Sequence, residues 1–196
     1  MLSAIDILGA AIGLVYIVSE YRASRWFWPS SLLMSAFYLV IDLQARYYAN
    51  ASICLYNFAM SVYGLLVWRG LLGRGRKADV PERPITSCPR RLWPLLAGVV
   101  ALLTVLLWWL LRLTGESQLP WADGLSSALT IVGMWMLAHK WWQQWFCWLL
   151  VEPLMFFLFL RAGLYASALL YVVYTVFCIL GLIRWRRLCT PAGTPS

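Results

Sequence analysis

Long apolar runs separated by short polar segments make up most of the chain. A helix needs about 20 mainly apolar residues to cross the roughly 30 Å hydrocarbon core of a bilayer. Seven runs approach that length, and they cover residues 5–21, 26–43, 47–68, 93–113, 121–138, 142–160 and 164–183. The pattern predicts an all-α membrane protein with seven transmembrane helices.

The composition agrees with a membrane protein and argues against several other classes. Hydrophobic residues make up 62% of the 196 residues and charged residues 12%, about half the charged share of a soluble domain. The five cysteines show no CxxC spacing, and GRGRK at 73–77 lacks the spacing of a phosphate-binding loop. A single histidine, His139, leaves no zinc protease motif. We therefore expect no metal, no cofactor and no enzymatic activity.

The basic residues predict the direction of the chain across the membrane. The formal net charge is +8, yet the lysines and arginines gather between the apolar runs, which argues against a nucleic-acid partner. If segment 69–92 is cytoplasmic, thirteen of them fall inside, and three fall outside, namely Arg46, Arg112 and Arg161. Basic loops face the cytoplasm, so we expect the N-terminus outside and the C-terminus inside.

The chain contains an internal repeat. Shifting the sequence by 117 residues matches the first three runs with the last three without a gap, and 16 of 65 positions are identical. The identical pairs of rarer residue types are Asp6 with Asp123, Trp28 with Trp145, Tyr48 with Tyr165, Gly64 with Gly181, Trp68 with Trp185 and Arg69 with Arg186. The sequence therefore predicts a duplicated three-helix unit.

The repeat divides the chain into five parts. We expect a first three-helix repeat in 1–68, a cytoplasmic linker in 69–92, a connecting helix in 93–113, a second three-helix repeat in 114–188 and a cytoplasmic tail in 189–196. Three helices plus one connector give an even number of crossings, so the two repeats face the same way. Transporters built from such parallel repeats bind substrate where the repeats meet, which favours transport.

The sixth apolar run contains a candidate binding site. Glu152 lies in its middle, where a charge costs about 2.5–3.5 kcal/mol on insertion scales. Trp141, Trp145, Trp148 and Glu152 recur at helical spacing along one face, with Gln144 beside them. Indole faces attract planar cations, and a carboxylate accepts hydrogen bonds or balances a positive charge. The alternative is a neutral Glu152 that bonds a neighbouring helix.

A proline follows the acidic residue of the sixth run. Pro153 cannot donate the helix hydrogen bond to the carbonyl of Leu149, and its ring clashes with that carbonyl. We therefore expect an interrupted helix of the kind found at transporter binding sites.

The third and seventh runs supply candidate walls for the site. Cys54, Asn57 and Ser61 share one face of the third run. The offset of 117 matches them with Tyr171, Tyr174 and Cys178 of the seventh run. An asparagine inside the membrane is expected to face protein or a cavity; a simple interhelical hydrogen bond is the alternative.

Several segments resemble the PnuC-type nicotinamide riboside transporters, a bacterial family of vitamin-uptake proteins. They are YANASICLYNFAMSVYGLLVW (48–68), WADGLSSALTIVGMWMLAHK (121–140), QWFCWLLVEP (144–153) and GLYASALLYVVYTVFCILGL (163–182). The resemblance implies two parallel three-helix units joined by a connecting helix, similar to the SWEET sugar transporters. It also implies a homotrimer in the bacterial inner membrane, with one substrate path per protomer. Transport would be facilitated diffusion by alternating access, with the vitamin trapped by cytosolic phosphorylation.

The chain departs from the family pattern where specificity is expected. Nicotinamide riboside transporters typically show NWxxWxxxN in the sixth span, and the matching residues here are Gln144, Trp145, Trp148 and Glu152. In the third span, Cys54 stands where the family usually has a glutamine, and Ser61 stands where it usually has an asparagine. The family includes transporters that look specialised for thiamine, and a glutamate suits the amino group and ring nitrogen of its aminopyrimidine. We therefore expect a cationic B vitamin as substrate, with thiamine slightly ahead of nicotinamide riboside.

Two other classes of function compete with transport. A membrane enzyme acting on a lipid-like substrate would use Glu152 or Asp123 and would require a metal or a second acid nearby. A non-transporting assembly subunit would present its tryptophan-rich surfaces to partner helices and would have a filled interior.

Overall fold

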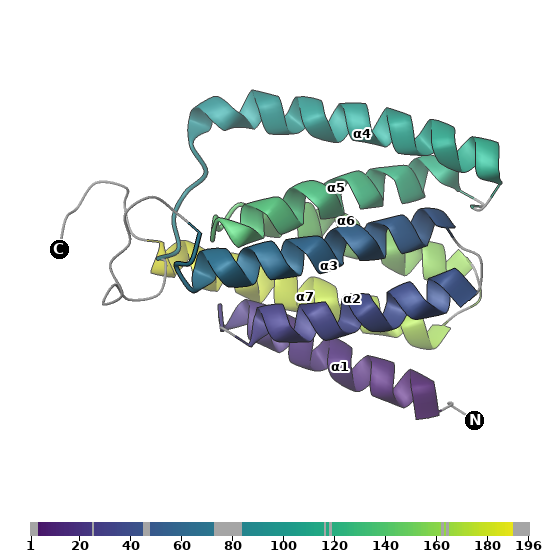
Figure 1. Ribbon diagram of the computed structural model, residues 1–196, viewed down its shortest axis with the longest axis horizontal. Helices are drawn as coiled ribbons and strands as arrows, with labels where there is room; N and C mark the ends of the chain where they lie inside the picture. The colour runs from purple at the N-terminus through teal and green to yellow at the C-terminus, as the bar shows by residue number, and fades with distance from the viewer. Residues whose placement is uncertain are drawn as a thin grey trace. The chain divides into compact units, whose positions relative to one another are not determined.

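The computed structural model describes residues 4–24, 26–44, 48–72, 84–115, 117, 119–161, 163 and 165–189, and these form seven α-helices and one short 3-10 turn (Figure 1). In chain order the elements are α1 (Ala4–Tyr21), α2 (Phe27–Gln44), α3 (Tyr48–Trp68), η1 (Arg90–Leu92), α4 (Trp93–Thr114), α5 (Pro120–Ala138), α6 (Gln144–Arg161) and α7 (Tyr165–Leu188). Each predicted run therefore corresponds to one helix.

The largest difference in helix bounds is at the end of α7. The apolar run ends at residue 183, whereas the helix continues to Leu188 through the sequence RWRRL. Positively charged side chains in the last turn interact favourably with the negative end of the helix dipole. The basic residues therefore extend the helix beyond its apolar part.

Four helical segments of the described residues are long and apolar enough to cross a membrane by length and composition. They are Ala51–Trp68, Arg90–Thr114, Gln144–Arg161 and Ala168–Leu188. The apolar part of α2, Phe27–Ile41, is shorter than these. A span of 15 to 18 residues matches the bilayer only if it stands upright or if flanking residues reach the interface.

The chain divides into two compact units, residues 1–84 and residues 85–196. In the first unit, α1 packs on α2 and α2 packs on α3. In the second unit, α4 packs on α5, α5 on α6 and α6 on α7. The order of neighbours in α5–α7 is therefore the order found in α1–α3.

The same packing arrangement of two tryptophans and a glycine occurs once in each unit. Its members are Trp28, Gly64 and Trp68 in the first unit and Trp145, Gly181 and Trp185 in the second. In both, the first indole lies so close over the glycine that a Cβ there would overlap the ring. The two indoles meet edge to face, with ring centroids 5.4 Å apart in the first unit and 5.7 Å in the second. We call this arrangement the Trp-Gly-Trp frame; it explains why these three positions are identical in the two repeats.

Residues 85–88, which we call the strap, are tied to the turn between α5 and α6. The turn is formed at Lys140, which has a left-handed backbone with φ of 53°. The Thr86 N–H donates to the Lys140 carbonyl (3.0 Å), and the Trp142 N–H donates to the Thr86 carbonyl (3.2 Å). These bonds form an isolated parallel bridge between Thr86 and Trp141.

Side chains reinforce the strap. The Cys88 N–H donates to Oε1 of Gln143 (2.9 Å), and the Trp142 indole N–H donates to the Ser87 hydroxyl (3.0 Å). The Cys88 side chain is buried, and burial raises the pKa of its thiol. The end of the linker is therefore a fixed part of the second unit.

Two expectations for the sixth run are wrong. Trp141 is not on the α6 face, because the helix begins at Gln144 and Trp141 belongs to the bridged turn. Pro153 does not interrupt the helix, since α6 continues through it to Arg161.

Several of the basic residues that predict the direction of the chain across the membrane are not among the described residues. This applies to the basic side chains Arg25, Arg46, Arg74, Arg76, Lys77 and Arg83 and to tail residues 190–196.

Candidate functional site

The first half of α6 carries a row of polar and aromatic side chains one helical turn apart. Gln144 is fully buried, Trp148 is buried, and Glu152 is half-buried with its Oε2 atom out of contact with solvent. The indole N–H of Trp148 donates to Oε1 of Gln144, which fixes the orientation of both side chains. We call Gln144, Trp148 and Glu152 the α6 triad.

The amide of Gln144 keeps one group available for a ligand. Its Oε1 atom is engaged by Trp148, whereas its Nε2 atom is buried and has no hydrogen-bond partner among the described residues. Leaving a buried donor unsatisfied costs about 1–3 kcal/mol. A ligand with an acceptor at this point would recover that free energy.

The same positions of the first unit carry different side chains. The offset of 117 matches the α6 triad with Phe27, Ser31 and Ser35. Phe27 is fully buried and contacts the ring of Tyr16 at 4.8 Å and that of Trp68 at 6.3 Å. Only the second unit therefore carries an amide, an indole and a carboxyl at these places.

A glycine on α5 makes room for the indole of the α6 triad. A Cβ at Gly133 would lie 3.4 Å from the ring of Trp148 and 3.2 Å from Cβ of Cys147. In the first repeat, Tyr16 occupies the position of Gly133, and the small Ser31 occupies that of Trp148. The large side chain is therefore on the first helix in the first repeat and on the second helix in the second repeat. Sequence reasoning missed Gly133, although the mismatch with Tyr16 was a signal.

Trp145, which was predicted to bind substrate, makes the packing contacts of its counterpart Trp28. It is fully buried, lies over Gly181 and contacts Trp185 edge to face. Its Nε1 atom has no hydrogen-bond partner among the described residues, and the same is true of Nε1 in Trp28. The described contacts of Trp145 therefore hold α6 against α7.

The two predicted tyrosines lie on α7 in one aromatic cluster with α6. Tyr171 stacks on Phe159 with ring centroids 5.1 Å apart, and Tyr174 meets Tyr171 edge to face at 5.7 Å. Both tyrosines are half-buried. Because Trp145 contacts α7 near one end of the helix pair and Phe159 near the other, Glu152 lies between these two levels, as Tyr174 does on α7.

The predicted residues of α3 lie in the first unit. The hydroxyls of Ser61 and Ser31 are hydrogen-bonded at 2.7 Å, and Ser61 also donates to the Asn57 carbonyl at 2.7 Å. Ser61 is therefore buried, and its hydroxyl is part of a hydrogen bond between α2 and α3. Asn57 and Cys54 are half-buried, and Oδ1 of Asn57 is a buried acceptor without a partner among the described residues.

A membrane enzyme would use Asp123 or Glu152, and among the described residues neither belongs to a metal-binding group. Asp123 lies in the first turn of α5 and accepts a hydrogen bond from the Ser117 hydroxyl. Within the described part of the chain, no three histidine, cysteine, aspartate or glutamate side chains gather to hold a metal ion.

Comparison with known proteins points to one group of transporters. The family model described as nicotinamide mononucleotide transporter matches residues 3–187. The riboflavin/roseoflavin transporter RibM of Streptomyces davaonensis is 27% identical over 92% of this chain and 83% of its own. The nicotinamide riboside transporter PnuC of Escherichia coli is 24% identical over 94% and 85%.

A solved structure shares the fold. The crystal structure of the vitamin B3 transporter PnuC superimposes with a TM-score of 0.71, covering 92% of this chain and 79% of that one at 22% sequence identity. Agreement over this much of the chain means that the helices follow the same fold.

Proposed function

Because the chain belongs to the nicotinamide mononucleotide transporter family, we propose that it carries a flat, cationic B vitamin across the membrane, with thiamine as first candidate and nicotinamide riboside as second. The relatives are transporters, so the protein is a membrane transporter and not an enzyme. The observation that carries the choice of a cationic substrate is the α6 triad, which is present in one repeat only.

Each member of the triad matches a part of thiamine. The carboxylate of Glu152 accepts a hydrogen bond from the exocyclic amino group of the pyrimidine and balances the thiazolium charge. The indole of Trp148 offers an aromatic face to a planar cation, an interaction of about 2 kcal/mol when desolvated. The buried Nε2 of Gln144 donates to a ring nitrogen. Tyr174 of α7, which meets Tyr171 edge to face, lies between the same two levels of the helix pair as Glu152 and would supply a second aromatic ring.

The family and the internal repeat support a proposal for the mode of transport. In this proposal α1–α3 and α5–α7 are two three-helix repeats joined by α4, and the identical order of helix neighbours within each supports the duplication. The protein is a homotrimer of the bacterial inner membrane. The vitamin moves down its gradient by alternating access and is trapped by cytosolic phosphorylation, in keeping with a sequence that has no phosphate-binding loop for ATP.

Riboflavin is a further candidate, because a riboflavin transporter is among the relatives. An amide such as that of Gln144 both donates and accepts, which suits the imide edge of a flavin. A carboxylate offers no such match when ionised, because it only accepts. Glu152 therefore places riboflavin behind the cationic vitamins.

Uptake by proteoliposomes tests the proposal. We expect the purified protein to equilibrate labelled thiamine at a saturable rate, without ATP or an ion gradient, and to be inhibited by excess unlabelled thiamine. Nicotinamide riboside and riboflavin are measured in the same vesicles, with protein-free liposomes as control. Saturable uptake of riboflavin alone would overturn the proposal that the substrate is cationic. Uptake of none of the three would overturn the proposal that the protein transports a vitamin.

Thiol labelling tests the orientation. Cys189 is half-buried at the end of α7, whereas Cys88 is buried and its raised pKa keeps its thiol neutral and slow to react. We expect a membrane-impermeant maleimide to label inside-out vesicles and not right-side-out vesicles. The variant Cys189→Ser should lose most of that label. Labelling from the outer side would reverse the predicted direction of the chain.

A further inference from the structure

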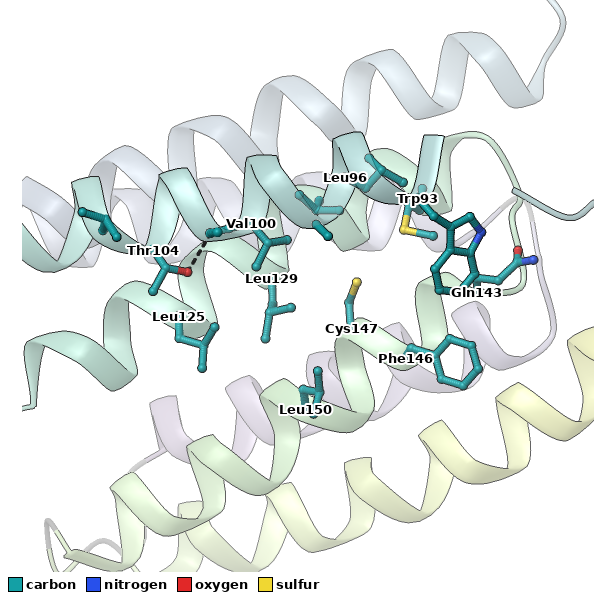
Figure 2. A pocket seen from close by; sticks show the side chains of 15 residues that line it. Trp93, Leu96, Val100, Thr104, Leu125, Leu129, Gln143, Phe146, Cys147 and Leu150 are labelled. Atoms are coloured by element: carbon teal, nitrogen blue, oxygen red, sulfur yellow. Dashed lines mark hydrogen bonds between the residues drawn. The ribbon is translucent and has the colours of Figure 1, made fainter. Parts of the chain in front are cut away.

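An apolar groove lies between α4 and the helices α5 and α6 of the second unit (Figure 2). Its volume is about 660 Å³. Side chains such as Leu96 of α4, Leu129 of α5 and Leu150 of α6 line it. Two polar side chains in its lining already have partners within the chain: Thr104 donates to the Val100 carbonyl (2.7 Å), and Gln143 accepts from the strap. The groove therefore offers a ligand an almost entirely apolar surface.

The groove is a wedge that opens toward η1. At its narrow end α4 and α5 nearly touch, because a Cβ at Gly124 would lie 2.9 Å from the backbone nitrogen of Trp108 and 3.1 Å from the Thr104 carbonyl oxygen. Toward the start of α4 the two helices separate, and side chains of α6 line the space between them (Figures 1 and 2). The wide end lies at Trp93.

The length of the groove matches one leaflet of a bilayer. Its lining on α4 runs from Trp93 to Val105, about 18 Å at 1.5 Å per residue. Half of the hydrocarbon core is about 15 Å thick. A transmembrane helix of a partner would be expected to contact α4 along its whole length, whereas an acyl chain ends in the middle of the membrane. The extent of the groove therefore favours an acyl chain.

Charge at the wide end identifies the headgroup. Arg90 and Arg91 form η1 directly before Trp93, and both are exposed. Trp93 is itself partly exposed, as expected of an indole at the membrane interface. We infer that the groove binds one acyl chain of an anionic phospholipid, whose phosphate lies against Arg90 and Arg91. Basic residues next to a membrane helix attract anionic lipids in this way.

Native mass spectrometry of the detergent-solubilised protein tests this inference. The probes are dioleoylphosphatidylglycerol and dioleoylphosphatidylcholine, which share acyl chains and differ in headgroup charge. Each arginine near the headgroup contributes about fivefold to affinity. We therefore expect tighter binding of phosphatidylglycerol, and we expect Arg90→Gln with Arg91→Gln to weaken it about 30-fold, to the level of phosphatidylcholine.

A second variant tests whether the acyl chain binds in the groove. Ala97 lines the groove, so Ala97→Phe should fill it and reduce binding of both lipids. Leu102 is exposed on α4 outside the groove, so Leu102→Phe is the matched control and should change neither. The arginine variant leaves the packing untouched and carries the test if Ala97→Phe does not fold.

Three results would overturn the inference. The first is equal affinity of the wild-type protein for the two lipids. The second is unchanged lipid binding by the double arginine variant or by folded Ala97→Phe. The third is a change in subunit number with Ala97→Phe while lipid binding persists, which would assign the groove to contact between copies of the chain.

Discussion

Replacing Glu152 with glutamine is expected to reduce thiamine uptake by proteoliposomes about 10- to 100-fold. Glutamine keeps the size of the side chain but removes its charge and its ability to accept from both oxygens. A hydrogen bond to a charged group contributes about 1.5–3 kcal/mol, which corresponds to this range of affinity. Because Oε2 of Glu152 is buried in α6, water does not compensate for the loss. The measurement is the initial rate of uptake over a range of thiamine concentrations.

An acid-to-amide change elsewhere in the second unit is the control for Glu152→Gln. Asp123 lies in the first turn of α5, away from the middle of α6, and bonds Ser117. Asparagine can keep that bond, so Asp123→Asn should transport thiamine at nearly the wild-type rate. Equal thiamine transport by Glu152→Gln and wild-type protein would remove the carboxylate from the proposed site. A switch from thiamine to riboflavin would instead identify Glu152 as the residue that selects charge.

Replacing Gly181 with alanine is expected to lower the thermal stability of the protein in detergent. The added Cβ would overlap the ring of Trp145, which is fully buried and has no room to move. Overpacking of this kind costs about 1–3 kcal/mol. Alanine returns up to about 1 kcal/mol, because it is the better helix former. With the full helix-forming gain subtracted, we expect a net loss of up to about 2 kcal/mol, seen as a lower midpoint of thermal unfolding.

Two comparisons separate the clash from a general effect of glycine replacement. Gly98 on α4 has open space where a Cβ would be, so Gly98→Ala should leave the midpoint unchanged or raise it. In a Trp145→Leu background the ring is gone, and Gly181→Ala should no longer destabilise. A destabilisation by Gly181→Ala that persists in that background would show that Trp145 is not the cause.

The long apolar runs predicted the helices closely, because the membrane leaves few alternatives for an apolar run of this length. The repeat was also visible, since Trp28, Gly64 and Trp68 are rare residue types that recur at one offset. What the repeat meant for each residue was not visible. The spacing of Trp145 relative to Glu152 suggested a shared binding face, whereas its described contacts are those of the packing residue Trp28.

The errors in the sixth run have a common cause, which is that tertiary contacts outweigh local pattern. Trp141 fits the helical spacing. However, backbone hydrogen bonds between Thr86 of the strap and both Lys140 and Trp142 hold Trp141 in the turn. Pro153 removes one hydrogen bond of α6, yet the helix continues. Contacts with α7 hold it at Trp145 before the proline and at Phe159 after it. Neither the strap nor these contacts can be read from the spacing of residues on one helix.

The duplicated Trp-Gly-Trp frame separates what holds a repeat together from what distinguishes one repeat from the other. Both copies keep the indole over the glycine, while positions 144, 148 and 152 are free to differ from 27, 31 and 35. Under the proposed function, such a duplication lets the second repeat change its cargo through a few substitutions along α6, while the frame stays the same in both repeats. Relatives that carry different vitamins should therefore differ mainly along that helix and hardly at the frame.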